Sequence, residues 1–357
     1  MDVPAPLLVL VGPTAVGKTS LAIRLAEALT GEIVSADSMQ VYIGMDIGTA
    51  KPSRQEREKI PHHLIDIVEP TESFSVARYT ELAHRAIAAI HTRGHLPILT
   101  GGTGLYIRAV VDGLPLPPAP PNPGIRARLE EEARKLGSGA LHERLARVDP
   151  ESAARLHPND QRRIIRALEI YETTGRPRSA TLHPQAATSR YKAHWFGLTR
   201  PRHSLYHRIN ERVEAQIAAG LVQEVQELRA SGWNPDSTSN QALGYKEIVD
   251  YLDGKVSLVE AKERLKKATR QYAKRQLSWW RADRRIRWIN LDDWAEEEAC
   301  HWIVQAFLAE ETPGVDMPAM RVCFVPPVPS RPIFLAGPDI PAPACLRKSP
   351  GEDPPQP

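Results

Sequence analysis

The stretch LLVLVGPTAVGKTS, residues 7–20, constrains the fold more than any other part of the chain. Five apolar residues predict a short buried strand, and the residues after Gly17 have the apolar spacing of a helix. Between them, the pattern Gly12-x-x-x-x-Gly17-Lys18-Thr19 lets successive backbone N–H groups point at one anion at the start of the helix. This order of strand, glycine-rich loop and helix predicts a phosphate-binding loop, or P-loop, in an α/β protein.

The P-loop pattern recognises a phosphate chain and carries no information about a nucleoside. Lys18 would supply a full positive charge, and the hydroxyl of Thr19 is suited to binding Mg²⁺. A nucleoside triphosphate is therefore the default ligand for such a loop, and another diphosphate or triphosphate fits the same pattern.

Apolar segments that alternate with helical ones predict the rest of the sheet. Strands that alternate with helices favour a parallel α/β sheet, which binds its ligands at the carboxyl ends of the strands. Further strands are expected at 32–37, 62–70, 96–104, 194–200 and 286–290. Helices are expected at 17–31, with a stop at Gly31, and at 76–90, 125–174, 203–230 and 256–281, with a last helix that ends near Leu308.

Two proline-rich segments predict the domain organisation. Residues 113–124 contain six prolines within nine positions, which is typical of a stiff connector, and the helical stretch after it ends at Gly175. Residues 312–357 contain 13 of the 32 prolines and no periodicity, which predicts a disordered tail without a catalytic role. The predicted parts are a P-loop α/β core of 1–124 and 194–311, an all-helical insertion of 125–193, and the tail of 312–357.

The composition excludes several classes of protein. A formal net charge of +3 permits a polyanionic partner without requiring one. The three cysteines, Cys300, Cys323 and Cys345, are widely spaced, so we expect neither a disulfide framework nor a zinc site. No apolar run approaches the roughly 20 residues of a membrane helix, and no basic segment precedes the first one. We therefore expect a soluble, cytoplasmic protein.

Acidic residues at two predicted strands are candidates for the chemistry of the site. Asp37 ends the strand at 32–37, and the polar, glycine-rich segment after it predicts a long loop over a cleft; an ordinary helix cap is the alternative. Asp66 is suited to holding Mg²⁺ in a kinase, although a capping or solvated aspartate is the favoured interpretation. We interpret the histidines as structural or surface residues, among them His62, His63, His91 and His95.

Basic residues gather in two predicted helices. Arg162, Arg163 and Arg166 lie on one side of the first. Residues 262–287 hold eleven Lys or Arg against two acids. Such stripes with interleaved aromatic residues are typical of a surface that binds folded RNA, whereas a solvated helix face is the alternative. The aromatic residues are Tyr272, Trp279, Trp280 and Trp288, and we expect core packing for at least two of these tryptophans.

Six motifs resemble those of the tRNA dimethylallyltransferase family, the bacterial tRNA isopentenyltransferases. In chain order they are GPTAVGKT, SADSMQVYIGMDIGTAKP, PHHLID, LTGGTGLYIRA, HPNDQRRIIRALEIYETTG and RQYAKRQLSWWR, and they span about residues 7–290. The resemblance implies that the P-loop holds dimethylallyl diphosphate, not a nucleotide. It also implies transfer of the dimethylallyl group to N6 of the adenosine just 3′ of the anticodon, with release of diphosphate.

The resemblance also implies roles for individual residues. Asp37 matches the carboxylate that takes a proton from the adenine amine, Thr103 contacts the same adenine, and Thr19 binds Mg²⁺. Residues that match the diphosphate site are Gly12, Pro13, Thr14, Ala15, Val16, Gly17, Lys18, Thr19 and Arg212, the last of which spacing alone would place on a helix surface. Residues that match tRNA contacts are Asp37, Ser38, Met39, Gln40, Thr103, Arg126, Gln161, Arg162, Arg163, Ile164 and Ile165; the spacing to Arg126 is one residue longer than the family pattern.

Other functions remain open at this stage. A P-loop kinase would need a second acid and a mobile arginine lid, and neither is clear in the sequence. An enzyme that prenylates free adenylate shares the same chemistry, but the helical insertion and the basic stretch favour tRNA. An RNA-binding regulator without catalysis is disfavoured by the intact Lys18, Thr19, Asp37 and Thr103. The C-terminal segment lacks zinc-finger spacing, which suggests a bacterial type, and we expect a monomer.

Overall fold

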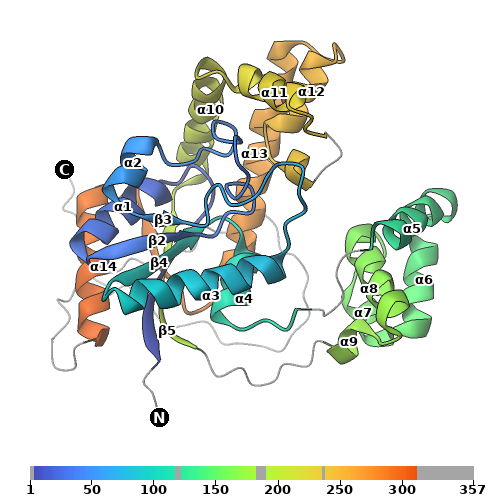
Figure 1. Ribbon diagram of the computed structural model, residues 1–357, viewed down its shortest axis with the longest axis horizontal. Helices are drawn as coiled ribbons and strands as arrows, with labels where there is room; N and C mark the ends of the chain where they lie inside the picture. Colours follow the sequence, from blue (N-terminus) through green and yellow to red (C-terminus); the bar gives the residue numbers. More distant parts are fainter. Residues whose placement is uncertain (1–3, 117–121, 182–189, 235–237, 312–357) are drawn as a thin grey trace, which may run out of the picture. The chain divides into compact units, whose positions relative to one another are not determined.

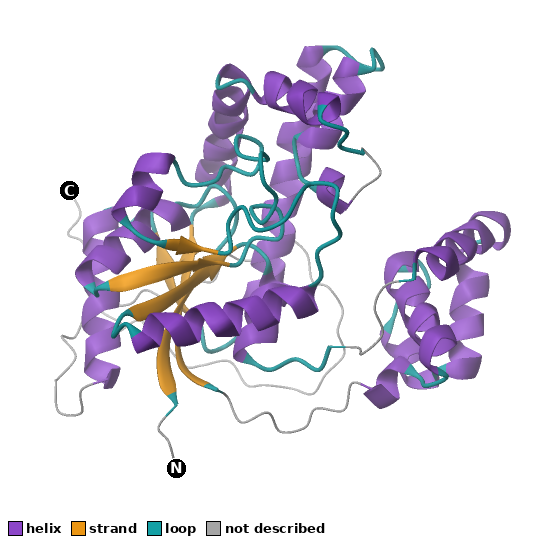
Figure 2. Ribbon diagram, viewed as in Figure 1, coloured by secondary structure: helices purple, strands orange, loops and turns teal. Residues whose placement is uncertain are grey.

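The computed structural model describes residues 4–116, 122–181, 190–234 and 238–311. A six-stranded sheet lies at the centre of the core, and every pair of neighbouring strands is parallel (Figures 1 and 2). The strand order is β3-β2-β4-β1-β5-β6. The strands are β1 (Ala5–Val11), β2 (Gly31–Ser35), β3 (His62–His63), β4 (Leu96–Gly101), β5 (Tyr191–Thr199) and β6 (Arg287–Asn290). The predicted fold class, a parallel α/β sheet with helices, is confirmed.

The apolar run of β1 is buried on both faces of the sheet, as expected for a central parallel strand. Leu7, Val9 and Val11 face one hydrophobic core, which also contains buried residues of α3 (Val76–Thr92) and α4 (Gly104–Val111). Leu8 and Leu10 face a second core, which includes α1 (Lys18–Ala28) and α14 (Glu296–Glu311). Figure 1 shows these helix pairs on opposite faces of the sheet.

Four further helices belong to the α/β core domain. They are α10 (Arg202–Ala218), α11 (Leu221–Ala230), α12 (Tyr245–Leu252) and α13 (Leu258–Arg281), with the short α2 (Arg54–Lys59) and the 3₁₀ helix η1 (Thr238–Gln241) elsewhere in the core. Helix α13 buries a stripe that includes Leu265, Ala273 and Trp280. Within the part of the chain that the structure describes, no helix combines the length and apolar character needed to cross a membrane.

The predicted helical insertion has a hydrophobic core of its own, to which Leu129, Leu145 and Leu168 belong. Its last long helix ends at Gly175, which takes a left-handed φ of 68° as predicted for a helix stop. The insertion consists of α5 (Pro123–Leu136), α6 (Ser138–Val148), α7 (Pro150–Arg155), α8 (Gln161–Thr174) and the short α9 (Arg178–Thr181).

Local predictions were wrong where the backbone turns sharply. The strand expected at 62–70 is only two residues long, because Leu64 and Asp66 take positive φ values of 65° and 57°, which a strand cannot contain. Helix α1 ends at Ala28 and not at Gly31, which is instead the first residue of β2.

Element boundaries differ from the prediction at three further places. The helix expected at 203–230 is two helices, because Gly220 takes a φ of 101° between α10 and α11. Pro123, placed in the connector, is the first residue of α5, where its missing N–H costs nothing. Strand β5 begins at Tyr191, so the last three residues of the predicted insertion pair with β1. Helix α12 was not predicted, and the tail of 312–357 lies outside the described residues.

Candidate active site

Three loops meet at the carboxyl ends of the adjacent strands β1, β4 and β2. The loop after β1 carries the P-loop, the loop after β2 carries Asp37, and the loop after β4 carries Thr103. Ala36 links the last two loops, because its N–H donates to Thr100 O at 2.7 Å and its carbonyl accepts from Thr103 N at 3.0 Å. The sheet therefore brings together candidate residues that are more than 60 positions apart in the chain.

The P-loop requires glycine at both of its fixed positions. Gly17 has a φ of 116°, and a Cβ at Gly12 would lie 2.7 Å from the carbonyl oxygen of Leu198. The ammonium of Lys18 folds back over the loop and donates to the carbonyls of Gly12 at 2.9 Å and Pro13 at 2.7 Å. These contacts hold the Lys18 charge above the start of α1, where the helix dipole also favours an anion.

Two half-buried basic residues, Lys18 and Arg212, share this site. Burial and the nearby Arg212 lower the pKa of Lys18 to about 7, while Asp37 acts in the opposite direction. Burial likewise lowers the pKa of Arg212. Within the described chain, no carboxylate lies within 4.0 Å of either cation. Two neighbouring basic side chains that lack an ion pair favour the binding of an anion, which would in turn favour the charged form of Lys18.

Two cavities meet at these residues. The P-loop lobe, about 450 Å³, is lined by Lys18 and Thr19 among others. The Thr103 lobe, about 760 Å³, is lined by Thr103 and Trp279. Asp37 and Arg212 line both lobes, together with Thr14, Thr49, Gly102, Tyr272 and Gln276. A phosphate-containing molecule in the P-loop lobe and a second molecule in the Thr103 lobe could therefore meet at Asp37.

The Asp37 carboxylate is held by a short local network. Its Oδ1 accepts from Met39 N at 2.9 Å, while Oδ2 has no hydrogen-bond partner within the described chain. The Thr103 hydroxyl accepts from Ser38 N at 3.0 Å and lies 3.3 Å from the Ser38 hydroxyl. One carboxylate oxygen is thus oriented by the backbone, and the other is available to a substrate.

Gln276 on α13 connects two of the loops. Its Oε1 accepts from Thr14 N at 2.8 Å, and its Nε2 donates to Gly102 O at 2.9 Å. A Cβ at Gly102 would lie 2.2 Å from that amide nitrogen, so only glycine fits there. Sequence reasoning missed Gln276, although a signal exists: it is a polar residue at an inward position between Ala273 and Trp280 of an amphipathic helix.

A model of the IPP transferase family matches residues 40–283. The chain belongs to this family. The tRNA dimethylallyltransferase of Thermomicrobium roseum is 49% identical over 312 residues, which are 87% of this chain and 94% of that protein. The full-length tRNA isopentenylpyrophosphate transferase from Bacillus halodurans is 44% identical with a TM-score of 0.63, covering 86% of this chain and 98% of its own. A eukaryotic dimethylallyltransferase acting on tRNA is 30% identical with a TM-score of 0.72, over 86% and 79% of the two chains.

In this IPP transferase, the residues predicted to contact tRNA on α8 divide into two groups. Arg162 and Arg163 are exposed and Gln161 is half-buried at the start of the helix. Ile164 and Ile165 are buried in the core of the helical insertion, so their side chains pack there and cannot reach an RNA. Among these predicted residues of α8, only those of the first turn have side chains accessible to a partner.

Two arginines of the insertion have a structural partner. Arg126 and Arg166 both bind the fully buried carboxylate of Glu169, with Nη–Oε2 distances of 3.0 and 2.7 Å. Burial of Glu169 without these cations would be costly. The Arg126 pair joins α5 to α8, whereas the Arg166 pair lies within α8. The spacing of basic residues in the sequence predicts a positively charged helix face here. It does not reveal that the buried Glu169 carboxylate pairs with two of these arginines.

The basic stretch on α13 divides in a similar way. Lys262 and Lys266 pair with Glu214 of α10, which places them in the helix packing. Trp280 is buried, and Trp288 is half-buried against the same core, which confirms the expectation of core packing for two tryptophans. Trp279 is different, because 43% of it is exposed at the edge of the Thr103 lobe.

The remaining polar candidates make hydrogen bonds or ion pairs within the protein. Asp66 pairs with Lys51 and Arg57, so its carboxylate is engaged by cations of the same loop region. His63 and His95 lie 2.6 and 2.8 Å from the buried Glu32. The Gln40 amide is occupied within the protein: it accepts from Ser35 Oγ at 3.0 Å and lies 3.3 Å from the carbonyls of Thr49 and Ala50. Among the described residues, no group of three or more His, Cys, Asp or Glu could hold a metal ion.

Proposed function

We propose that this chain is a tRNA dimethylallyltransferase, which transfers the dimethylallyl group of dimethylallyl diphosphate to N6 of the adenosine 3′-adjacent to the anticodon. The observation that carries the proposal is the pair of lobes that meet at Asp37. The P-loop lobe is lined by Lys18 and Arg212, which have no ion pair within the described chain, and the other lobe opens beside Thr103. Relatives that match most of this chain carry the name tRNA dimethylallyltransferase.

The proposed reaction forms one bond and breaks another. The N6 nitrogen attacks C1 of the dimethylallyl group, the C1–oxygen bond to diphosphate breaks, and one N6 proton passes to Asp37. The adenine amine is a weak nucleophile because its lone pair is shared with the ring, so a carboxylate that accepts the proton assists as charge develops. The available Oδ2 of Asp37 is suited to this role, and the Thr103 hydroxyl would orient the base.

The leaving diphosphate gains negative charge as the bond breaks. The P-loop amides from Ala15 to Thr19, together with Lys18 and Arg212, would stabilise that charge, because they are held in place before the reaction. We propose that the Thr19 hydroxyl, which lines the same lobe, binds Mg²⁺ together with diphosphate oxygens. Mg²⁺ is commonly held by few protein ligands together with phosphate oxygens and water, so a single hydroxyl is sufficient. When bound, the ion would neutralise part of the diphosphate charge.

We further propose that the tRNA is held at Ser38 and Met39 and at Gln161, Arg162 and Arg163. The target adenine must leave its stack to reach Asp37, which costs a few kcal/mol or less in a single-stranded anticodon loop. Exposed arginines at the start of α8 would contact phosphates and fix the position of that loop. We propose a cytoplasmic monomer, and size-exclusion chromatography with light scattering would test the oligomeric state.

The test is a transfer assay with labelled dimethylallyl diphosphate, Mg²⁺ and bulk tRNA, with AMP and ATP as comparators. We expect the label in tRNA alone, in a modified adenosine next to the anticodon. Label in AMP would identify an adenylate prenyltransferase. Phosphoryl transfer from ATP without prenyl transfer would identify a kinase, and either result would overturn the proposal.

A further inference from the structure

Glu224 of α11 binds three successive backbone N–H groups of the long loop that follows β2. Its Oε2 accepts from Asp46 N at 3.0 Å and Ile47 N at 2.7 Å, and its Oε1 accepts from Gly48 N at 3.2 Å. The Tyr245 hydroxyl donates to the same carboxylate at 2.6 Å. Consecutive N–H groups that converge in this way form an anion-binding nest, and here a side chain of the protein fills it.

A residue of α10, Gln216, binds the backbone carbonyls of the same loop segment. Nε2 of Gln216 donates to Ile47 O at 2.7 Å and Gly48 O at 2.9 Å. Gly48 must be glycine, because a Cβ there would lie 2.4–2.8 Å from atoms of the Tyr245 ring. We call the segment 46–48 with Gln216, Glu224 and Tyr245 the clasp.

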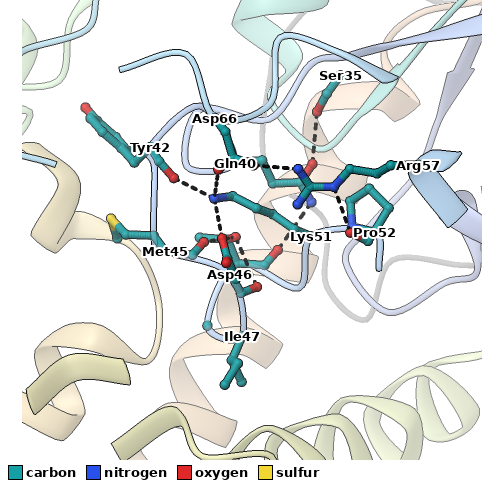
Figure 3. A network of polar contacts seen from close by, with 12 residues as sticks. Ser35, Gln40, Tyr42, Met45, Asp46, Ile47, Lys51, Pro52, Arg57 and Asp66 are labelled. Atoms are coloured by element: carbon teal, nitrogen blue, oxygen red, sulfur yellow. Dashed lines mark hydrogen bonds and ion pairs between the residues drawn. The ribbon is translucent and has the colours of Figure 1, made fainter. Parts of the chain in front are cut away.

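The opposite side of the loop is tied to itself and to the segment that follows β3. Nζ of Lys51, whose side chain is only 1% exposed, donates to Tyr42 O and Asp46 Oδ1, both at 2.6 Å, and also to Asp66 (Figure 3). The Thr49 hydroxyl donates to Met45 O at 2.6 Å. The loop is thus held by contacts on both sides, and the clasp connects it to α10 and α11.

Gly48 and Gln216 of the clasp line the Thr103 lobe, but no residue of the clasp is among the proposed reacting groups. Arg212 lies one helical turn before Gln216 on α10 and lines both lobes, as does Thr49 one residue after the clasp segment. Glu224 lines neither lobe. The helix that carries Arg212 and the loop that begins at Asp37 are therefore joined through a residue that would touch neither substrate.

We propose that Glu224 is a positioning residue for prenyl transfer: by closing the clasp it holds Arg212 at the junction of the two lobes, opposite Asp37. The inference rests on the proposed function. Arg212 would meet the leaving diphosphate, so a shift of α10 should impair its binding and departure while leaving the tRNA surface on α8 intact. Small misplacements of a charge-stabilising group lower rates by up to about a hundredfold.

Glu224→Gln tests the proposal, because the amide keeps the size of the side chain but can accept through only one atom. We expect kcat to fall and KM for dimethylallyl diphosphate to rise, together about tenfold to a hundredfold in kcat/KM, with unchanged tRNA affinity. Glu224→Asp, which keeps the charge, should recover part of the loss. Glu227→Gln is the matched control, since Glu227 is exposed on the same helix and bonds Gln223 at 3.1 Å.

Hydrogen exchange gives a second readout that does not depend on catalysis. The amides of Asp46, Ile47 and Gly48 should exchange slowly in the wild type and in Glu227→Gln, and quickly in Glu224→Gln. Should Glu224→Gln fail to fold, Gln216→Leu opens the clasp from the other side and should change the same kinetic constants. The inference would be overturned if Glu224→Gln showed fast amide exchange but wild-type kinetics. It would also be overturned if all three amides of Glu224→Gln exchanged as slowly as in the wild type. A wild-type enzyme that prenylates no tRNA would instead refute the proposed function, and the exchange experiment would still test the clasp.

Discussion

The side chain of Gln276 accepts a hydrogen bond of 2.8 Å from the backbone nitrogen of Thr14 in the P-loop. The same amide donates to Gly102 O, so one residue of α13 sets the spacing between the phosphate-binding loop and the loop that carries Thr103. Only 6% of Gln276 is exposed, and removal of either hydrogen bond would leave a buried polar group unpaired.

We predict that Gln276→Glu lowers the affinity for dimethylallyl diphosphate at least tenfold and destabilises the protein by about 1–3 kcal/mol. The carboxylate can accept from Thr14 but cannot donate to Gly102, and it adds a negative charge beside the diphosphate site. Equilibrium binding and urea unfolding measure the two effects. Gln271→Glu, at an exposed position of the same helix, is the control and should change neither.

Asp37→Asn should lower kcat by about 10²-fold or more, the usual contribution of a positioned base. Binding of dimethylallyl diphosphate should not weaken, because the substitution removes a negative charge that acts on Lys18 and Arg212. Single-turnover rates and equilibrium binding separate these effects. A variant with a near wild-type rate would exclude Asp37 from proton transfer.

Trp279 should stack on a base of the anticodon loop, since it is an exposed aromatic residue at the edge of the Thr103 lobe. Stacking on an aromatic side chain contributes about 1–3 kcal/mol per base, so Trp279→Ala should weaken tRNA binding roughly five- to a hundredfold. Trp279→Phe should retain most of the affinity. Trp294→Phe is the control, because Trp294 is half-buried against the core on the other face of the sheet. Unchanged tRNA affinity in Trp279→Ala would show that Trp279 does not stack on a base of the tRNA.

Local sequence patterns predicted the elements whose causes are local. The apolar run of β1 and the glycines of the P-loop determine their own conformation, because burial and positive φ follow from those residues themselves. The segment at 62–70 also appeared apolar and regular, yet Asp66 is turned toward Lys51 and Arg57, which precede that segment in the chain. The pattern of apolar residues within the nine positions of this segment cannot reveal these ion pairs.

The candidate site shows the same division. Lys18, Asp37 and Thr103 follow strand ends, so a parallel sheet brings them together once the strand order is known. Arg126 and Arg166 differ, because their partner Glu169 is a charged residue in a buried position that basic spacing does not reveal. Glu224 and Gln276 bind backbone groups more than 170 residues away in the chain, and only the tertiary structure shows these hydrogen bonds.

Glu32 should make stability depend on pH in the acid range. Hydrogen bonds from Arg93 lower the pKa of this buried carboxyl from 4.5 to about 2, against the effect of burial. The unfolded chain then binds more protons between these values, so the stabilisation is complete above pH 4.5 and is lost as the pH falls toward 2. At about 1.4 kcal/mol per pKa unit it is on the order of 3 kcal/mol.

The measurement is urea unfolding of the wild type and Glu32→Gln at several pH values from about 7 down to about 3, across the range in which the carboxyl is expected to titrate. The difference in unfolding free energy should shrink toward acid pH. Glu58→Gln, at an exposed residue paired with Arg54, should show no such trend. A difference for Glu32→Gln that stays constant over this range would show that the carboxyl is not held ionised.

The last prediction separates the two substrates. Lys18 faces the P-loop lobe, whereas Arg162 and Arg163 are exposed on α8. Lys18→Ala should therefore impair use of dimethylallyl diphosphate and leave tRNA binding at low salt nearly unchanged. Arg162→Ala with Arg163→Ala should do the reverse. The slope of log affinity for tRNA against log salt should flatten by roughly 0.7 to 0.9 for each phosphate that the variant no longer binds.

Arg155→Ala provides the matched control for this experiment, because Arg155 is an exposed arginine of the same insertion and pairs with Glu151 on α7. It removes the same kind of charge without touching α8, so a general electrostatic effect would appear in it as well. Arg166 is left intact, since its removal would leave the buried Glu169 without one of its cations and confuse folding with binding. If the double variant keeps the affinity and salt slope of the wild type, the first turn of α8 does not contact RNA, and its arginines are an ordinary solvated helix surface.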